Sequence, residues 1–149
     1  MANASTDEDV GRRGARLSAL EGVAAMNEIL LYIGSAVLIV WGIAHIVPTK
    51  NVVKGFGTIS DDNKRIITME WVAEGLTLCF IGLLVLFVTI LGDSANHVSL
   101  IVYRASAAML IAMAGWTALT GARTPIVPIK ICPFVKTIVA ILFILGSVL

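Results

Sequence analysis

Two carboxylates stand at the start of an otherwise apolar stretch, MEWVAEGLTLCFIGLLVLFVTILG. Glu70 and Glu74 are four residues apart, so in a helix they project from the same side, one turn from each other. An unpaired carboxylate is costly within a bilayer, and Glu74 is therefore expected to meet a positive charge or to hold a proton. Two kinds of chemistry fit: a structural ion pair between helices, or a proton relay at the polar end of a quinone or lipid pocket.

Candidate partners for these carboxylates lie near the ends of other apolar stretches. If four stretches cross a membrane, one side gathers a candidate polar cluster of Glu74, Glu70, His45, Lys136 and Arg123. The second histidine, His97, falls on the opposite side, about 30 Å away. The two histidines therefore cannot jointly hold a haem or a metal ion within one chain.

The composition of the 149-residue chain is typical of a membrane protein. Hydrophobic residues make up 58% and charged residues 14%, and the mean hydropathy is +0.93, well above the values of soluble globular domains. The net charge of +1 provides no basic surface, so we expect no nucleic-acid partner. Membrane lipids are the first expected partners.

Four apolar stretches are long enough to be membrane spans, because a spanning helix needs about 20 apolar residues. The predicted fold is an all-α integral membrane protein, a four-helix bundle with a polar N-terminal tail. The tail is residues 1–27 and the transmembrane domain residues 28–149, with approximate spans 29–47, 71–91, 98–120 and 134–149. The second helix is expected to begin near Asp61, after Ser60. The fourth is expected to enter as extended chain from Pro125 and to become helical near Pro133.

The tail and the loops bear on location and orientation. Residues 1–16 are expected to be mobile, and residues 17–28 have helical periodicity suited to lying on the membrane or extending the first span. Four spans place both termini on one side, and the lysines and arginines of the first loop favour a cytoplasmic loop. We expect the cytoplasmic membrane of a bacterium or archaeon.

Further residues are candidates for contacts with other subunits or lipids. Arg104 and the adjacent Tyr103 lie inside the third span, where an arginine snorkels to headgroups or meets another subunit. Phe56, in a Gly-Phe-Gly turn of the long first loop, suits a lid or partner contact, or an ordinary connection. Small residues mark seams of close helix packing: Gly34, Ser35, Gly42, Gly75, Gly82 and several in residues 105–115.

No sequence pattern indicates a catalytic or metal-binding residue. Ser-His-Asp sets, metal-ligand spacings and dinucleotide fingerprints do not occur. Cys79 and Cys132 fall at different depths, so we expect two small buried hydrophobes and no disulfide.

Several short motifs resemble the DoxX-like group of four-helix membrane proteins. They are Gly42-Ile-Ala-His45 at the end of the first span, and Glu74-Gly75-Leu76 continuing to Gly82 in the second, followed by a small-residue third span. The resemblance covers residues 29–121 in outline. It implies a four-helix bundle and, in some members, association with quinone-linked sulfur oxidation or redox enzymes.

Two hypotheses of function follow from these features. The first is a small non-catalytic accessory subunit of a larger redox or energy-converting membrane complex, with larger subunits as partners and no cofactor. The second is a DoxX-like, quinone-linked oxidoreductase subunit in which Glu74, Glu70 and His45 bind or protonate a quinone head group. Transport or lipid binding is a third, less specific alternative.

Overall fold

The computed structural model describes residues 4–92 and 94–148, and every regular element in these ranges is helical. The elements, in chain order, are α1 (Ala4–Ile46), α2 (Thr49–Lys54), α3 (Asp61–Leu91), α4 (His97–Leu119), the 3-10 helix η1 (Gly121–Arg123) and α5 (Val127–Gly146). The predicted all-α fold with four long helices is confirmed.

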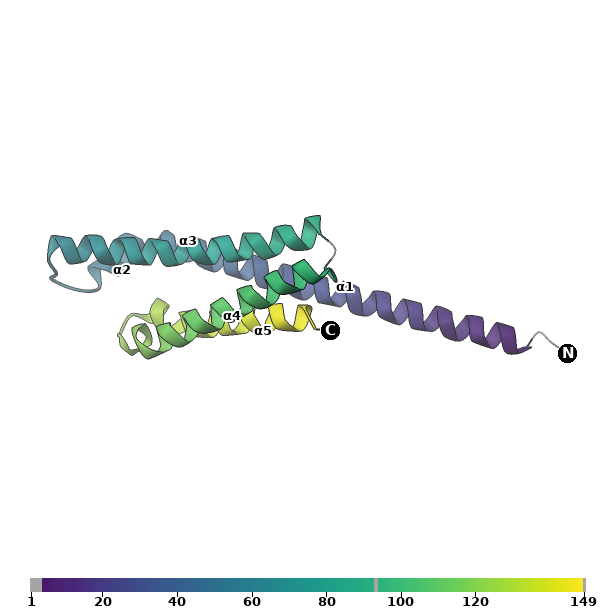
Figure 1. Ribbon diagram of the computed structural model, residues 1–149. Helices are drawn as coiled ribbons and strands as arrows, with labels where there is room; N and C mark the ends of the chain where they lie inside the picture. Colours follow the sequence, from purple (N-terminus) through teal and green to yellow (C-terminus); the bar gives the residue numbers. More distant parts are fainter. Residues whose placement is uncertain (1–3, 93, 149) are drawn as a thin grey trace.

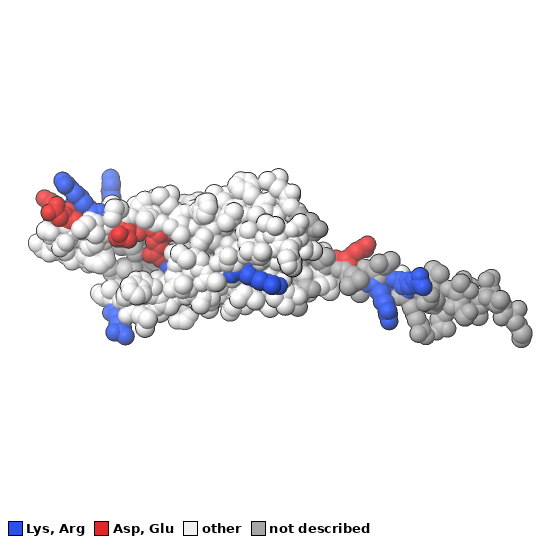
Figure 2. Space-filling model, in the orientation of Figure 1, with Lys and Arg blue, Asp and Glu red and all other residues white. Residues whose placement is uncertain are grey.

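Four of the described helices are long and apolar enough to cross a bilayer. The segments are Glu21–Ile46 of α1 and the whole of α3, α4 and α5. Figure 2 shows that acidic and basic side chains gather towards the two ends of the molecule, while the middle is mostly uncharged. Large apolar side chains such as Phe80, Phe87 and Ile101 are exposed over this middle part.

Local sequence sets the helix boundaries. Ser60 caps α3, because its hydroxyl accepts a hydrogen bond from the backbone N–H of Asn63 (3.3 Å), and the predicted start near Asp61 is confirmed. Asn96 caps α4 in the same way. The fourth helix does not begin near Pro133 as expected; it begins at Val127. Pro128 lies in the first turn, where a proline needs no N–H partner, and the helix continues through Pro133.

The helix α1 is longer than the predicted first span. It begins at Ala4, inside the segment expected to be mobile, and runs unbroken to Ile46. Its 43 residues correspond to about 64 Å at 1.5 Å per residue. The first part of α1 projects past the other helices (Figure 1). Residues 17–28 are therefore continuous with the first long helix, which agrees with one of the two alternatives left open by the sequence, an extension of the first apolar stretch.

The helices pack as two pairs. α3 lies along α1, α4 lies along α5, and α1 also contacts α5 (Figure 1). The core between them holds fully buried side chains from all four long helices, including Leu38, Leu78, Leu110 and Phe143. Because α3 packs mainly on α1 and α4 mainly on α5, a groove remains between α3 and α4.

Two glycines bring α1 and α3 close together at the level of the polar cluster. A Cβ atom on Gly42 would lie 2.7 Å from the carbonyl oxygen of Gly75, and a Cβ atom on Gly75 would lie 2.9 Å from that of Gly42. Gly82 meets Ser35 similarly, so these predicted seams are confirmed. Gly115, expected to serve the same purpose on α4, faces open space.

Candidate functional site

An ion pair between Glu74 of α3 and Lys136 of α5 is the centre of the candidate site. The Lys136 ammonium bonds to the Glu74 carboxylate and donates a second hydrogen bond to Thr117 Oγ1 of α4 (2.9 Å). The Lys136 side chain is 1% exposed and the Glu74 side chain 26% exposed. The pair therefore joins three helices, and Glu74 is the partner that remains accessible.

Cys132 brings the ion pair into contact with His45. Its Sγ lies 3.6 Å from His45 Nε2 and donates to Glu74 Oε1 at 3.6 Å. Cys132 is one turn before Lys136 on α5, so both side chains reach the same side of the helix. Cys132 is buried, but the expectation that it acts only as a small hydrophobe is wrong, because polar groups surround its sulfur. The expected absence of a disulfide is confirmed, since both cysteines are free.

Two tryptophans hold His45 in place. The Trp71 ring stacks on the imidazole, with centroids 4.7 Å apart and planes at 15°, and its Nε1 donates to the His45 carbonyl oxygen (2.5 Å). The Trp41 ring also lies beside the imidazole, with centroids 5.7 Å apart and planes at 60°, and its Nε1 donates to Cys132 Sγ (3.5 Å). His45 and Cys132 are thus fixed by indole groups from α1 and α3.

The groove between α3 and α4 opens onto this cluster. Its volume is about 590 Å³, within the range of small-molecule sites. Polar groups on its wall come from Glu70, Glu74, Thr117 and Lys136, and the apolar lining includes Met109, Met113 and Trp116. The groove therefore combines an apolar channel with a few polar groups, the usual composition of a ligand site.

The structure brings together only part of the predicted cluster. Glu74, His45 and Lys136 meet, whereas Glu70 is exposed at the groove wall one turn from Glu74. Arg123 is exposed in η1 and takes no part in the described hydrogen bonds of the cluster. The cation that pairs with Glu74 is Lys136 of α5.

The three residues expected to contact other subunits or lipids all have partners within the chain. Arg104 donates to the Ser147 carbonyl oxygen (3.1 Å) at the end of α5. Tyr103 is fully buried, and its hydroxyl accepts from Thr89 Oγ1 (3.1 Å). Phe56 packs against Val52, Trp71 and Ile129. The expectation of an external contact is corrected for Tyr103, whose burial leaves no surface for one.

Sequence reasoning missed Cys132, Trp41, Trp71 and Thr117. A spacing signal existed for three of them, because Trp41 precedes His45 by four residues, Cys132 precedes Lys136 by four, and Trp71 precedes Glu74 by three. Each is therefore on the same helix face as a predicted residue. No such signal pointed to Thr117, which depends on how α4 lies against α5.

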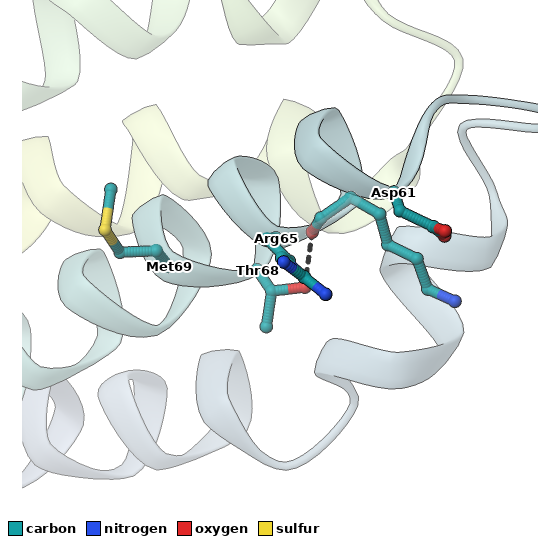
Figure 3. A pocket seen from close by; sticks show the side chains of 5 residues that line it. Asp61, Arg65, Thr68 and Met69 are labelled. Atoms are coloured by element: carbon teal, nitrogen blue, oxygen red, sulfur yellow. Dashed lines mark hydrogen bonds between the residues drawn. The ribbon is translucent and has the colours of Figure 1, made fainter.

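A second hollow lies at the start of α3, away from this cluster. Figure 3 shows Asp61, Arg65, Thr68 and Met69 on successive turns of the helix, with a hydrogen bond from Thr68 Oγ1 to the Lys64 carbonyl oxygen (2.7 Å). All of its lining residues come from one helix. Within the part of the chain that the structure describes, no second element contributes to its lining, so it is a weaker candidate for a ligand site than the groove.

Comparison of the chain with protein-family models, curated proteins and solved structures found no match.

Proposed function

We propose that this protein is an integral membrane protein that binds the head group of a quinone-class molecule in the groove between α3 and α4. The observation that carries the proposal is the position of the Glu74–Lys136 pair, which lies on the wall of a groove of about 590 Å³ that is otherwise largely apolar. The proposal concerns binding, and electron transfer would require a redox partner.

Membrane insertion is the first part of this proposal. Four helices have the length and hydropathy of spans, and large apolar side chains cover the outside of the bundle. In water such a surface would be exposed to solvent at a high free-energy cost, whereas hydrocarbon tails solvate it well. The groove would then open sideways into the bilayer, where quinones dissolve.

The groove chemistry suits a quinone head group in both oxidation states. A quinone carbonyl oxygen accepts hydrogen bonds, and the Lys136 ammonium, which donates two of its three N–H groups to Glu74 and Thr117, has one left to donate. A quinol hydroxyl donates, and the accessible Glu74 carboxylate accepts. Trp116, Met109 and Met113 provide an apolar wall for the ring and the start of the tail.

A pair of alanine substitutions tests the site. Ala112 is exposed and lines the groove, whereas Ala108, one turn earlier on α4, is exposed outside it. The protein is placed in lipid nanodiscs and titrated with a short-chain quinone, with tryptophan fluorescence as the signal. We expect Ala112→Phe to weaken binding at least tenfold and Ala108→Phe to leave it unchanged.

Equal binding by the two variants would contradict the groove as the site. Absence of quinone binding by the wild-type protein would contradict the proposed function itself. Helix content and detergent-unfolding midpoints of both variants, measured alongside, show that each is folded.

The accessory-subunit hypothesis has support from a different feature. The first part of α1 projects beyond the bundle (Figure 1), and its described side chains, including Arg16 and Glu21, are exposed. A projecting helix of this kind offers a docking element for a soluble domain of a larger complex. Removal of residues 1–16 would then release larger partners from a mild-detergent preparation, while quinone binding in the groove would persist.

A further inference from the structure

Three potential ligand atoms for one metal ion converge beside the groove. His45 of α1, Glu74 of α3 and Cys132 of α5 each present one atom, and these atoms lie within 4.8 Å of one another. The residues are 29 to 87 positions apart in the sequence, so only the packing of three helices brings them together. We propose that His45, Glu74 and Cys132 bind one divalent transition-metal ion of the zinc type, an assignment that goes beyond quinone binding.

Two distances within the cluster match tetrahedral coordination. Bonds of about 2.3 Å from zinc to sulfur and about 2.0–2.2 Å to nitrogen or oxygen place two ligand atoms about 3.6 Å apart at the tetrahedral angle. Cys132 Sγ lies 3.6 Å from His45 Nε2 and 3.6 Å from Glu74 Oε1. The third separation, between His45 and Glu74, is at most 4.8 Å, and rotation of the carboxylate shortens it.

The surroundings of the cluster resemble the outer shell of a metal site. A ligating histidine usually donates its other ring N–H to a backbone carbonyl or carboxylate. His45 hydrogen-bonds to the backbone of Trp41, and with Nε2 turned to the sulfur, Nδ1 is the nitrogen left for that bond. The Trp41 indole N–H donates to Cys132 Sγ, an interaction that also stabilises a thiolate.

Charge and access are compatible with an ion at this position. The Glu74 carboxylate and the Cys132 thiolate, formed when the thiol proton leaves on metal binding, balance a divalent ion. The Glu74 oxygen that faces Cys132, Oε1, is also the one bonded to Lys136. On metal binding Oε1 would join the ion, and rotation of the carboxylate would give Oε2 to Lys136. Glu70, one turn away on the same groove wall, adds a second negative charge near the site. Entry is through the groove, past the partly exposed Glu74.

Cobalt(II) is the probe for this site, because a cobalt–thiolate bond gives a charge-transfer band in the near ultraviolet. The full chain is purified in detergent and titrated with Co²⁺, and then with Zn²⁺ as a competitor. We expect one ion per chain with thiolate and tetrahedral bands, loss of the thiolate band in Cys132→Ser, and at least tenfold weaker binding in His45→Gln.

Cys79→Ser is the matched control. The Cys79 thiol faces the Ile39 carbonyl oxygen (3.7 Å) on the α1 side of α3, outside the cluster, so this variant should keep the thiolate band. A wild-type protein that binds no Co²⁺ at excess ion, or an unchanged spectrum in Cys132→Ser, overturns the proposal.

X-ray absorption on the zinc-loaded wild-type protein needs no substitution. A sulfur neighbour at about 2.3 Å supports the site, and a shell of nitrogen and oxygen alone overturns it. Measuring quinone binding by Cys132→Ser separates the two proposals. A variant that still binds quinone but no longer binds the metal ion supports the metal site. The metal titration itself does not depend on which ligand the groove binds.

Discussion

At the scale of single residues, the buried Lys136 side chain is the main determinant of the stability of the cluster. Lys136 is almost fully buried, and its ammonium is satisfied by Glu74 and Thr117. Removal of one partner from a buried ion pair leaves an uncompensated charge, whereas replacement of both by apolar groups is often neutral. The pair therefore specifies how α5 lies against α3 and α4 more than it adds net stability.

We predict that Lys136→Met lowers the free energy of unfolding by about 3 kcal/mol. The double variant Glu74→Leu/Lys136→Met should recover most of this loss, because no unpaired charge remains. Unfolding is followed by far-ultraviolet circular dichroism during titration of detergent micelles with a denaturing detergent.

Lys130→Met is the control for this prediction. Lys130 is exposed on the same helix, so its loss should change stability by less than about 0.5 kcal/mol. Equal effects of Lys136→Met and Lys130→Met would contradict a buried, functional ion pair.

Part of the cluster could be predicted from residue types alone. Glu74 in an apolar helix requires a partner. Few basic side chains lie near the same end of the apolar stretches, and Lys136 and His45 were among these candidates. The choice between Lys136 and Arg123 could not be made, because it depends on where α5 begins. The role of Cys132 depends on the same rotation of α5 and was therefore missed.

At the scale of helices, the contact between α1 and α3 positions His45 opposite Glu74. Gly42 lies three residues before His45 and Gly75 directly follows Glu74, and the two glycines allow the backbones to touch at this level. The glycine spacing predicted the seam, since small residues permit close helix approach. The early start of α5 was not predicted, because prolines inside an apolar run suggested extended chain.

We predict that Gly42→Ala destabilises the bundle by about 1–3 kcal/mol, the usual range for overpacking. Its Cβ would lie 2.7 Å from the Gly75 carbonyl oxygen, and α1 would have to move away from α3. The same unfolding titration measures the effect.

Gly115→Ala provides the comparison at the element scale. A Cβ atom at Gly115 meets nothing within 4 Å, and alanine is favoured over glycine by about 1 kcal/mol in a helix. The variant should be neutral or more stable than wild type. If Gly115→Ala destabilised the protein as much as Gly42→Ala, close packing of α1 on α3 would not be the cause of the Gly42→Ala effect.

At the scale of the whole molecule, four helices long and apolar enough to cross a membrane and a projecting α1 define two ends. Most of the described charges lie towards these ends (Figure 2), as expected where helices leave a bilayer. If all four helices cross a membrane, both termini lie on one side and α2 with its flanking loop on the other. The basic residues Lys50, Lys54, Lys64 and Arg65 favour a cytoplasmic position for this loop.

We predict that topology reporters fused to the N-terminus and to the C-terminus both indicate the non-cytoplasmic side. A reporter inserted at Gly57, in the turn after α2, should indicate the cytoplasmic side. Termini on opposite sides of the membrane would contradict the four-span arrangement, and reversed signals at all three sites would contradict only the orientation.

The most direct test of the central claim is mass spectrometry of small molecules extracted from the protein after mild-detergent purification from its own membrane. Our account predicts a quinone at a fixed ratio to the wild-type chain and to Ala108→Phe, and its loss from Ala112→Phe. Wild-type protein that carries no quinone, or Ala112→Phe protein that carries the wild-type amount, would contradict the account.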